Sequence, residues 1–142
     1  MNGDDTLYFY LELYAAVNGQ HGRWDDVSMR AIATKTLFAT LPRCGTPDVI
    51  CKAAWVIPSW APAGVVVRLD SATNPRNFII GYQEGDKRDY VGLAKCVNGS
   101  YTQLISANVA YAPGAYVEVR VSGSDVALYY NGTQVGVTQT VS

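Results

Sequence analysis

Hydrophobic and polar residues alternate with a period of two over most of the chain from about residue 34 onward. No apolar stripe in this region keeps the 3.6-residue spacing of a helix for three turns. In the segment 116–123, three valines at alternate positions share one face, and Glu118 and Arg120 lie on the other. The pattern predicts an all-β, antiparallel protein, with strands at residues 48–57, 64–70, 78–83, 90–97, 100–107 and 116–123.

Short turn signals separate these strands. Asn98-Gly99 and Asn131-Gly132 each fit a two-residue hairpin turn of type I′, which needs positive φ at both central residues. Residues 84–89 hold five charges in six positions and predict a solvated turn. The N-terminal segment 7–17 is rich in aromatic residues, which favours a strand over a short helix.

Composition narrows the class of protein. The chain has 142 residues, 49% hydrophobic and 16% charged, which excludes a disordered tail and fits one domain over residues 1–142. Eleven basic and twelve acidic residues give a net charge of -1, without the basic excess that nucleic acid binding requires, so we expect no nucleic acid partner. No apolar window is long enough for insertion into a membrane, and the acidic start lacks the features of a signal peptide. Because charged residues are so scarce, either hydroxyl and amide groups keep the domain in solution or another molecule covers part of its surface.

The three cysteines exclude a framework of paired disulfides, because an odd number leaves at least one thiol unpaired within a monomer. Cys44 and Cys51 either close a short loop or remain thiols, and Cys96 lies inside an apolar strand pattern that predicts a buried thiol. With a single histidine, His21, and no C-x-x-C pair, we do not expect a zinc site.

Three segments carry a resemblance to a known family: AGVVVRLDSATNPRNFIIGYQ, YVGLAKCVNGSYTQLISA and PGAYVEVRVSGSDVALYYNGTQVG. Their order of strands and turns resembles the concanavalin A-like lectin and glucanase jelly roll, in its laminin G-like branch. The likeness covers roughly residues 22–142 and includes a G-x-W at Gly22-Arg23-Trp24. It implies a sandwich of two antiparallel sheets. Because the branch occurs in secreted, cell-surface and phage virion proteins, it also implies an extracellular or virion-associated location.

The chain departs from this family after the Asn131-Gly132 hairpin, where members usually continue into another strand. The sandwich is therefore expected to lack its last strand, which would leave an unpaired edge that another chain can join. Either the N-terminal segment 7–17 fills the gap, or a neighbouring subunit does, or the sequence is a fragment.

No constellation of residues predicts an enzyme. The acids Glu84, Asp86 and Asp89 have the spacing of a glycosidase motif found in this class of jelly roll. Glycoside hydrolysis, however, needs one carboxylate in a dry environment, whereas glycine, lysine and arginine between these acids indicate an exposed turn. A hydrolase is thus the weaker alternative.

The resemblance also implies a calcium site, because laminin G-like domains often bind calcium at the sandwich rim. Asp70, in the loop that follows a predicted strand, is the residue nominated as a ligand. The alternative interpretation is that Asp70 caps its own turn.

Ten tyrosines and three tryptophans point to sugar binding, which needs an aromatic platform surrounded by amide or charged groups. Trp60, in a turn between two prolines, is the best platform candidate. Polar residues on the strand faces opposite the valines could line the same site, although Glu118 and Arg120 equally fit a charge pair on a wet surface. The full set of candidates is Trp60, Arg68, Gln103, Glu118, Arg120 and Tyr129.

The leading hypothesis is a non-catalytic module that binds carbohydrate or serves in adhesion. The alternative is a structural assembly subunit, of a virion or other multimer, whose sheet edge is completed by a neighbouring chain. The expected partners are therefore carbohydrate or other protein subunits, and a homo-oligomer is expected in the second case.

Overall fold

The computed structural model describes residues 10–14, 28–32, 36–40, 48–55, 62–71, 74–84 and 89–142, with side chains from residue 48 onward. These residues form eleven strands, and every paired strand is antiparallel to its neighbours. None of the described residues forms a helix of the length and apolarity needed to cross a membrane.

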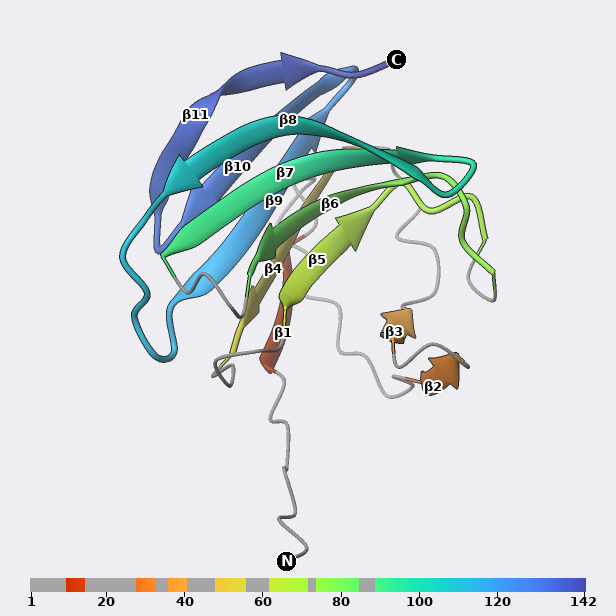
Figure 1. Ribbon diagram of the computed structural model, residues 1–142, viewed down its shortest axis with the longest axis horizontal. Helices are drawn as coiled ribbons and strands as arrows, with labels where there is room; N and C mark the ends of the chain where they lie inside the picture. The colour runs from red at the N-terminus through yellow and green to blue at the C-terminus, as the bar shows by residue number, and fades with distance from the viewer. Residues whose placement is uncertain are drawn as a thin grey trace, which may run out of the picture.

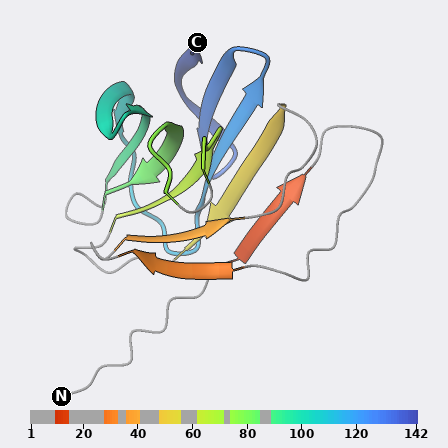
Figure 2. The same ribbon diagram turned by 90° about the vertical axis from the view of Figure 1, so that its right-hand side faces the viewer.

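Two sheets pack face to face as a sandwich (Figures 1 and 2). The first has five strands in the order β1-β4-β9-β10-β11, in which β1 extends the sheet formed by the other four. It consists of β1 (Tyr10–Tyr14), β4 (Val49–Ala54), β9 (Tyr116–Ser122), β10 (Asp125–Tyr130) and β11 (Thr133–Thr140). The second has four strands in the order β5-β6-β7-β8, which are Ala63–Val67, Phe78–Gln83, Tyr90–Val97 and Ser100–Asn108. A separate pair joins β2 (Ser28–Ile32) to β3 (Thr36–Thr40).

Aliphatic side chains from the inner faces of both sheets form the core. Val117, Val119 and Leu128 of the five-stranded sheet have no exposed surface, and neither do Val91 and Leu93 of the four-stranded sheet. These residues recur at alternate positions because successive side chains of a strand point to opposite faces. The all-β, antiparallel sandwich predicted from the sequence is therefore confirmed.

The two sheets approach each other closely at Gly81 of β6. A Cβ atom at this position would overlap Val119 Cγ2 and would lie 3.0 Å from Leu128 Cδ1. Since Val119 and Leu128 are fully buried, neither can move aside without disturbing the core. The absence of a side chain at Gly81 thus sets how closely β6 packs against β9 and β10.

The predicted hairpins have the expected backbone geometry. Asn98 and Gly99 have φ values of 51° and 83°, and Asn131 and Gly132 have values of 48° and 85°. Positive φ at both central residues is the condition for a type I′ turn, and these two turns join β7 to β8 and β10 to β11.

Two predicted strands end earlier than expected. The strand expected at residues 48–57 ends at Ala54. The strand expected at residues 64–70 ends at Val67, because Arg68 adopts a left-handed conformation with φ of 55°. The Arg68 guanidinium donates hydrogen bonds to the carbonyls of Val141, at 3.2 Å, and of Gly123. These contacts with the other sheet hold Arg68 in a geometry that cannot continue the strand.

The N-terminal segment supplies a strand, as its aromatic content predicted. β1 pairs with β4 from Tyr10 opposite Ala54 to Tyr14 opposite Ile50, and so forms one edge of the five-stranded sheet. β11 forms the other edge, and its pairing with β10 contains a register shift between Val126 and Leu128 of β10. Completion of an edge by a second chain stays a prediction.

We predict that Gly81→Ala lowers the free energy of unfolding by about 1–3 kcal/mol, because the added methyl group overpacks the core. Chemical denaturation measures the change. In a Val119→Ala background, where Cγ2 has been removed, the same substitution should cost clearly less. Equal costs in both backgrounds would show that the sheets are not in contact at this point.

Candidate functional site

The outer face of the five-stranded sheet carries a row of polar and aromatic residues. Strand register places Glu118 of β9 between Lys52 of β4 and Tyr129 of β10, and Tyr129 lies opposite Gln134 of β11. Directly opposite residues have Cβ atoms about 4.5–5.5 Å apart, so neighbours along this row can interact. The same alternation that turns the valines of β9 into the core turns Glu118 and Arg120 outward.

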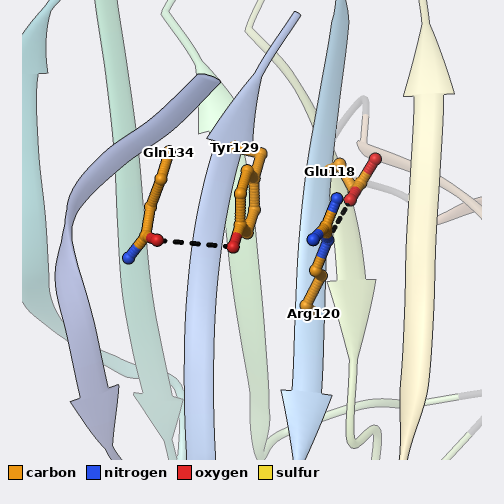
Figure 3. A network of polar contacts seen from close by, with 4 residues as sticks. All are labelled: Glu118, Arg120, Tyr129 and Gln134. Carbon is orange, nitrogen blue, oxygen red and sulfur yellow. Dashed lines mark hydrogen bonds and ion pairs between the residues drawn. The ribbon is translucent and has the colours of Figure 1, made fainter. Parts of the chain in front are cut away.

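A network of polar contacts links this row (Figure 3). Arg120 Nε donates to Glu118 Oε1, and the guanidinium lies over the Tyr129 ring with Cζ 3.9 Å from the ring centroid. The Tyr129 hydroxyl donates to Gln134 Oε1 at 3.3 Å, and Gln134 Nε2 donates to Thr138 Oγ1 at 3.3 Å. The network thus joins β9, β10 and β11, and within it the planar Arg120 guanidinium is stacked on the Tyr129 ring and hydrogen-bonded to Glu118 through Nε.

Burial differs sharply between the two members of the ion pair. The Glu118 side chain is only 7% exposed although it projects from the outer face, whereas that of Arg120 is 46% exposed. The hydrogen bond with Glu118 raises the pKa of Arg120 above its ordinary value. The hydrogen bond from Arg120 to Glu118 uses Nε, and nearly half of the Arg120 side chain is exposed, so its guanidinium is accessible to a ligand.

A second cation lies over an aromatic ring on the same face. Lys52 Nζ is 3.9 Å from the centroid of the Tyr116 ring. Lys52 and Tyr116 both adjoin Glu118, the first across the sheet and the second along β9. Together with Arg120 and Tyr129, they surround Glu118, which is consistent with its burial on an otherwise solvated face.

A shallow depression of about 450 Å³ adjoins Arg120 and Tyr129. Ile50 and Ala127 contribute apolar surface to its lining, and Thr138 contributes a hydroxyl. Two carboxylates also line it. Asp48 accepts a hydrogen bond from the Gly123 amide at 2.6 Å, and Asp125 accepts one from Thr140 Oγ1 at 3.0 Å. The depression therefore combines apolar walls with hydrogen-bonding groups.

Three of the six residues predicted to bind a ligand are brought together here: Glu118, Arg120 and Tyr129. Gln103 instead lies on the four-stranded sheet. Arg68 binds backbone carbonyls at one end of the sandwich, where it joins the two sheets and does not face this depression. Trp60, like His21, Cys44 and the residues between Glu84 and Asp89, lies outside the described residues.

Gln103 belongs to a second polar cluster, on the outer face of the four-stranded sheet. The Tyr82 hydroxyl donates to Gln103 Oε1 at 2.7 Å, and Gln103 Nε2 donates to the carbonyls of Leu93, at 3.0 Å, and Ile105. The Tyr90 ring lies beside that of Tyr82, with centroids 6.1 Å apart. Burial, together with the neighbouring Tyr90, raises the pKa of Tyr82 to about 12.

Asp70 caps its own loop. Its Oδ1 accepts a hydrogen bond from the Arg76 amide at 2.9 Å, and its Oδ2 accepts one from Asn77 Nδ2 at 2.7 Å. The backbone hydrogen bonds from Arg76 and Asn77 lower the pKa of Asp70. Within the described part of the chain, no three acidic, histidine or cysteine side chains are grouped so as to hold a metal ion. Asp70 therefore caps its own turn, and its role as a calcium ligand stays a prediction.

Sequence reasoning missed Gln134, Thr138 and Lys52. Gln134 had an available signal, because a two-residue turn at Asn131-Gly132 places residue 134 opposite Tyr129. The pairing of β4 with β9, which brings Lys52 beside Glu118, joins segments 66 positions apart and leaves no such local signal.

The sequence matches no protein-family model and no curated protein. Among solved structures, the chain is similar to "carbohydrate binding module CBM66 from Bacillus subtilis", with a TM-score of 0.52 and 10% sequence identity. The match covers 82% of this chain and 77% of that one. At this identity the likeness shows a shared β-sandwich fold. The laminin G-like branch suggested by the sequence is not shown by these comparisons.

We predict a coupling of roughly 1 kcal/mol between Glu118 and Arg120 in a double-mutant cycle of Glu118→Gln and Arg120→Gln, read from chemical denaturation. The value is modest because solvent reaches the Arg120 side chain. The control pair combines Glu118→Gln with Arg76→Gln, since Arg76 lies in the loop before β6. The effects of these two substitutions on the free energy of unfolding should be additive. A coupling no larger than that of the control pair would contradict the ion pair.

We predict that Tyr82 ionises near pH 12, and a titration followed by ultraviolet absorbance should show this late transition. Because Tyr82 ionises at its ordinary value of 10.0 once the chain unfolds, the free energy of unfolding should fall as the pH rises from 10.0 to about 12. Tyr82→Phe should abolish the late transition, and Tyr129→Phe should retain it. A Tyr82→Phe titration curve that keeps the late transition would assign it to another residue.

Proposed function

We propose that this domain is a non-catalytic carbohydrate-binding module of a secreted, surface or virion protein. Its binding surface is the outer face of the five-stranded sheet around Arg120. The observation that carries the proposal is the exposed guanidinium of Arg120, which Glu118 and Tyr129 hold in one orientation beside a depression. The sandwich fold shared with a carbohydrate-binding module gives supporting context.

The chemistry of this surface suits a saccharide. A sugar presents a rim of hydroxyl groups, each of which can donate and accept a hydrogen bond, together with apolar CH faces. The terminal nitrogens of Arg120 form a planar fork that can donate to two neighbouring hydroxyl oxygens. The Gln134 amide and the Thr138 hydroxyl add groups of both polarities, and Ile50 and Ala127 supply apolar contact.

The charges around the depression favour a neutral saccharide. Glu118 balances the charge of Arg120, and the carboxylate of Asp125 lines the same depression. An anionic sugar bound there would be repelled by the Asp125 carboxylate, which selects against it.

The arrangement of carboxylates supports binding without hydrolysis. Glycosidases place two carboxyl groups on either side of the scissile bond. The buried carboxylate of this face, Glu118, forms an ion pair with a guanidinium instead. Asp48 and Asp125 are engaged with a backbone amide and a threonine hydroxyl at the strand ends.

We predict that Arg120→Ala weakens binding at least tenfold, because it removes hydrogen bonds from a charged donor worth about 1.5–3 kcal/mol. A neutral glycan array identifies the bound saccharide, and isothermal titration calorimetry then compares the variants. Arg76→Ala makes the same change in charge at an exposed loop position and should leave the affinity unchanged. Failure of the wild-type protein to bind any glycan on the array, or equal affinities for both variants, would overturn the proposal.

A further inference from the structure

We propose that the outer face of the four-stranded sheet carries a second saccharide-binding platform, formed by the Tyr82 ring lying over Gly92 and held by Gln103. The two binding surfaces then lie on opposite faces of the sandwich, since β6 and β7 belong to one sheet and β9 and β10 to the other (Figure 1). The inference rests on the proposed function for the class of ligand, and its site is independent of Arg120.

Glycines flank Tyr82 on both neighbouring strands. Register places Gly64 of β5 and Gly92 of β7 directly opposite Tyr82. A Cβ atom at Gly92 would lie 2.8 Å from Tyr82 Cζ and 2.9 Å from its Cε1, and one at Gly64 would lie 3.0 Å from Tyr82 Cβ. The tyrosine ring therefore occupies the space above Gly92, so it lies against the sheet and does not stand away from it.

Hydrogen bonds fix the ring in this position. The phenol hydroxyl donates to Gln103 Oε1 at 2.7 Å, and the amide nitrogen of Gln103 is itself held by the backbone carbonyls of Leu93 and Ile105. These carbonyls can only accept hydrogen bonds, so Gln103 must present its oxygen to Tyr82. The pairing of β7 with β8 contains a register shift between Leu93 and Ala94, next to Gln103. This irregularity gives the Gln103 amide access to the carbonyls of Leu93 and Ile105.

The resulting surface has the features of a sugar platform. The Tyr82 and Tyr90 rings are half-buried, with a centroid distance of 6.1 Å and an interplanar angle of 46°. An aromatic face that is fixed before the ligand arrives binds the apolar CH face of a sugar with little loss of conformational entropy. Gln103 is exposed, and its Oε1 can accept one further hydrogen bond at the rim of this surface.

The charge beside this platform again favours a neutral ligand. Glu84, at the end of β6, is close enough to Tyr82 for its charge to raise the tyrosine pKa. An anionic sugar at Tyr82 would be repelled by this carboxylate. Both faces therefore select the same class of ligand, a neutral saccharide.

Two sites on opposite faces have a measurable consequence. Packed sheets are about 10 Å apart, with the core between them, so one short saccharide cannot occupy both sites at once. A polysaccharide chain bound to each face would instead be cross-linked by the protein. The wild-type domain should then bind polysaccharide through both faces. Because the cross-linked particles are larger, the light scattering of the mixture should rise.

The test compares wild type, Tyr82→Ala, Arg120→Ala and the double variant. The probes are dextran, xylan, galactomannan and inulin, used in affinity gel electrophoresis for binding and in light scattering for cross-linking. Each single variant should retain binding that is at least fivefold weaker and should lose cross-linking, and the double variant should lose binding. Tyr82→Phe, which keeps the ring and loses the hydrogen bond to Gln103, should give an intermediate affinity if Tyr82→Ala proves too unstable to test.

The outcomes separate the two proposals. Wild-type binding and cross-linking in Tyr82→Ala, or complete loss of binding in Arg120→Ala alone, would overturn the second platform and leave the proposed function intact. If Tyr82→Ala abolished polysaccharide binding and Arg120→Ala left it unchanged, the result would support the second platform and overturn the site at Arg120. No binding of any of the four polysaccharides by the wild-type protein would overturn both.

Discussion

The register of β9 is the constraint on which both the core and the candidate site depend. Val117 and Val119 are completely buried between the sheets, and Glu118 and Arg120 project from the opposite face of the same strand. Because side chains of a strand alternate, a slip of one residue would place both charges in the core and the valines in water. The pairings of β9 with β4 and β10 therefore secure the core and assemble the polar network in one step.

The close approach at Gly81 extends this constraint to the second sheet. Val119 fills the space that a side chain at Gly81 would need, so the inner face of β9 fixes the position of β6. Tyr82, which follows Gly81 on the outward face, carries the ring of the proposed second platform. Packing in the core thus determines where an aromatic group is presented on the outer face opposite to that of Arg120.

Much of this arrangement could be predicted from sequence because the relevant physics is local. Period-two alternation identified the strands from residue 48 onward and the outward position of Glu118 and Arg120, although it did not identify β2 or β3. The Asn-Gly pairs identified two hairpins through their need for positive φ. Alternation gives the face of a strand and says nothing about which sheet the strand joins. For this reason Gln103 was grouped with Arg120 although it lies on the other sheet. Arg68 was misplaced for a different reason, because its left-handed conformation accompanies contacts with Val141 and Gly123 that are 73 and 55 positions away.

The energetics of Glu118 argue that the network has a purpose beyond stability. Burying a carboxylate costs hydration energy, and an ion pair with a half-exposed partner returns little of it. An apolar side chain at this position would pack between Tyr129 and Lys52 without that cost. Glu118 does, however, fix the plane of the Arg120 guanidinium, and Gln103 does the same for the ring of Tyr82. On both faces a polar side chain uses its hydrogen bonds to hold a planar group in one orientation, which lowers the entropy cost of binding a ligand.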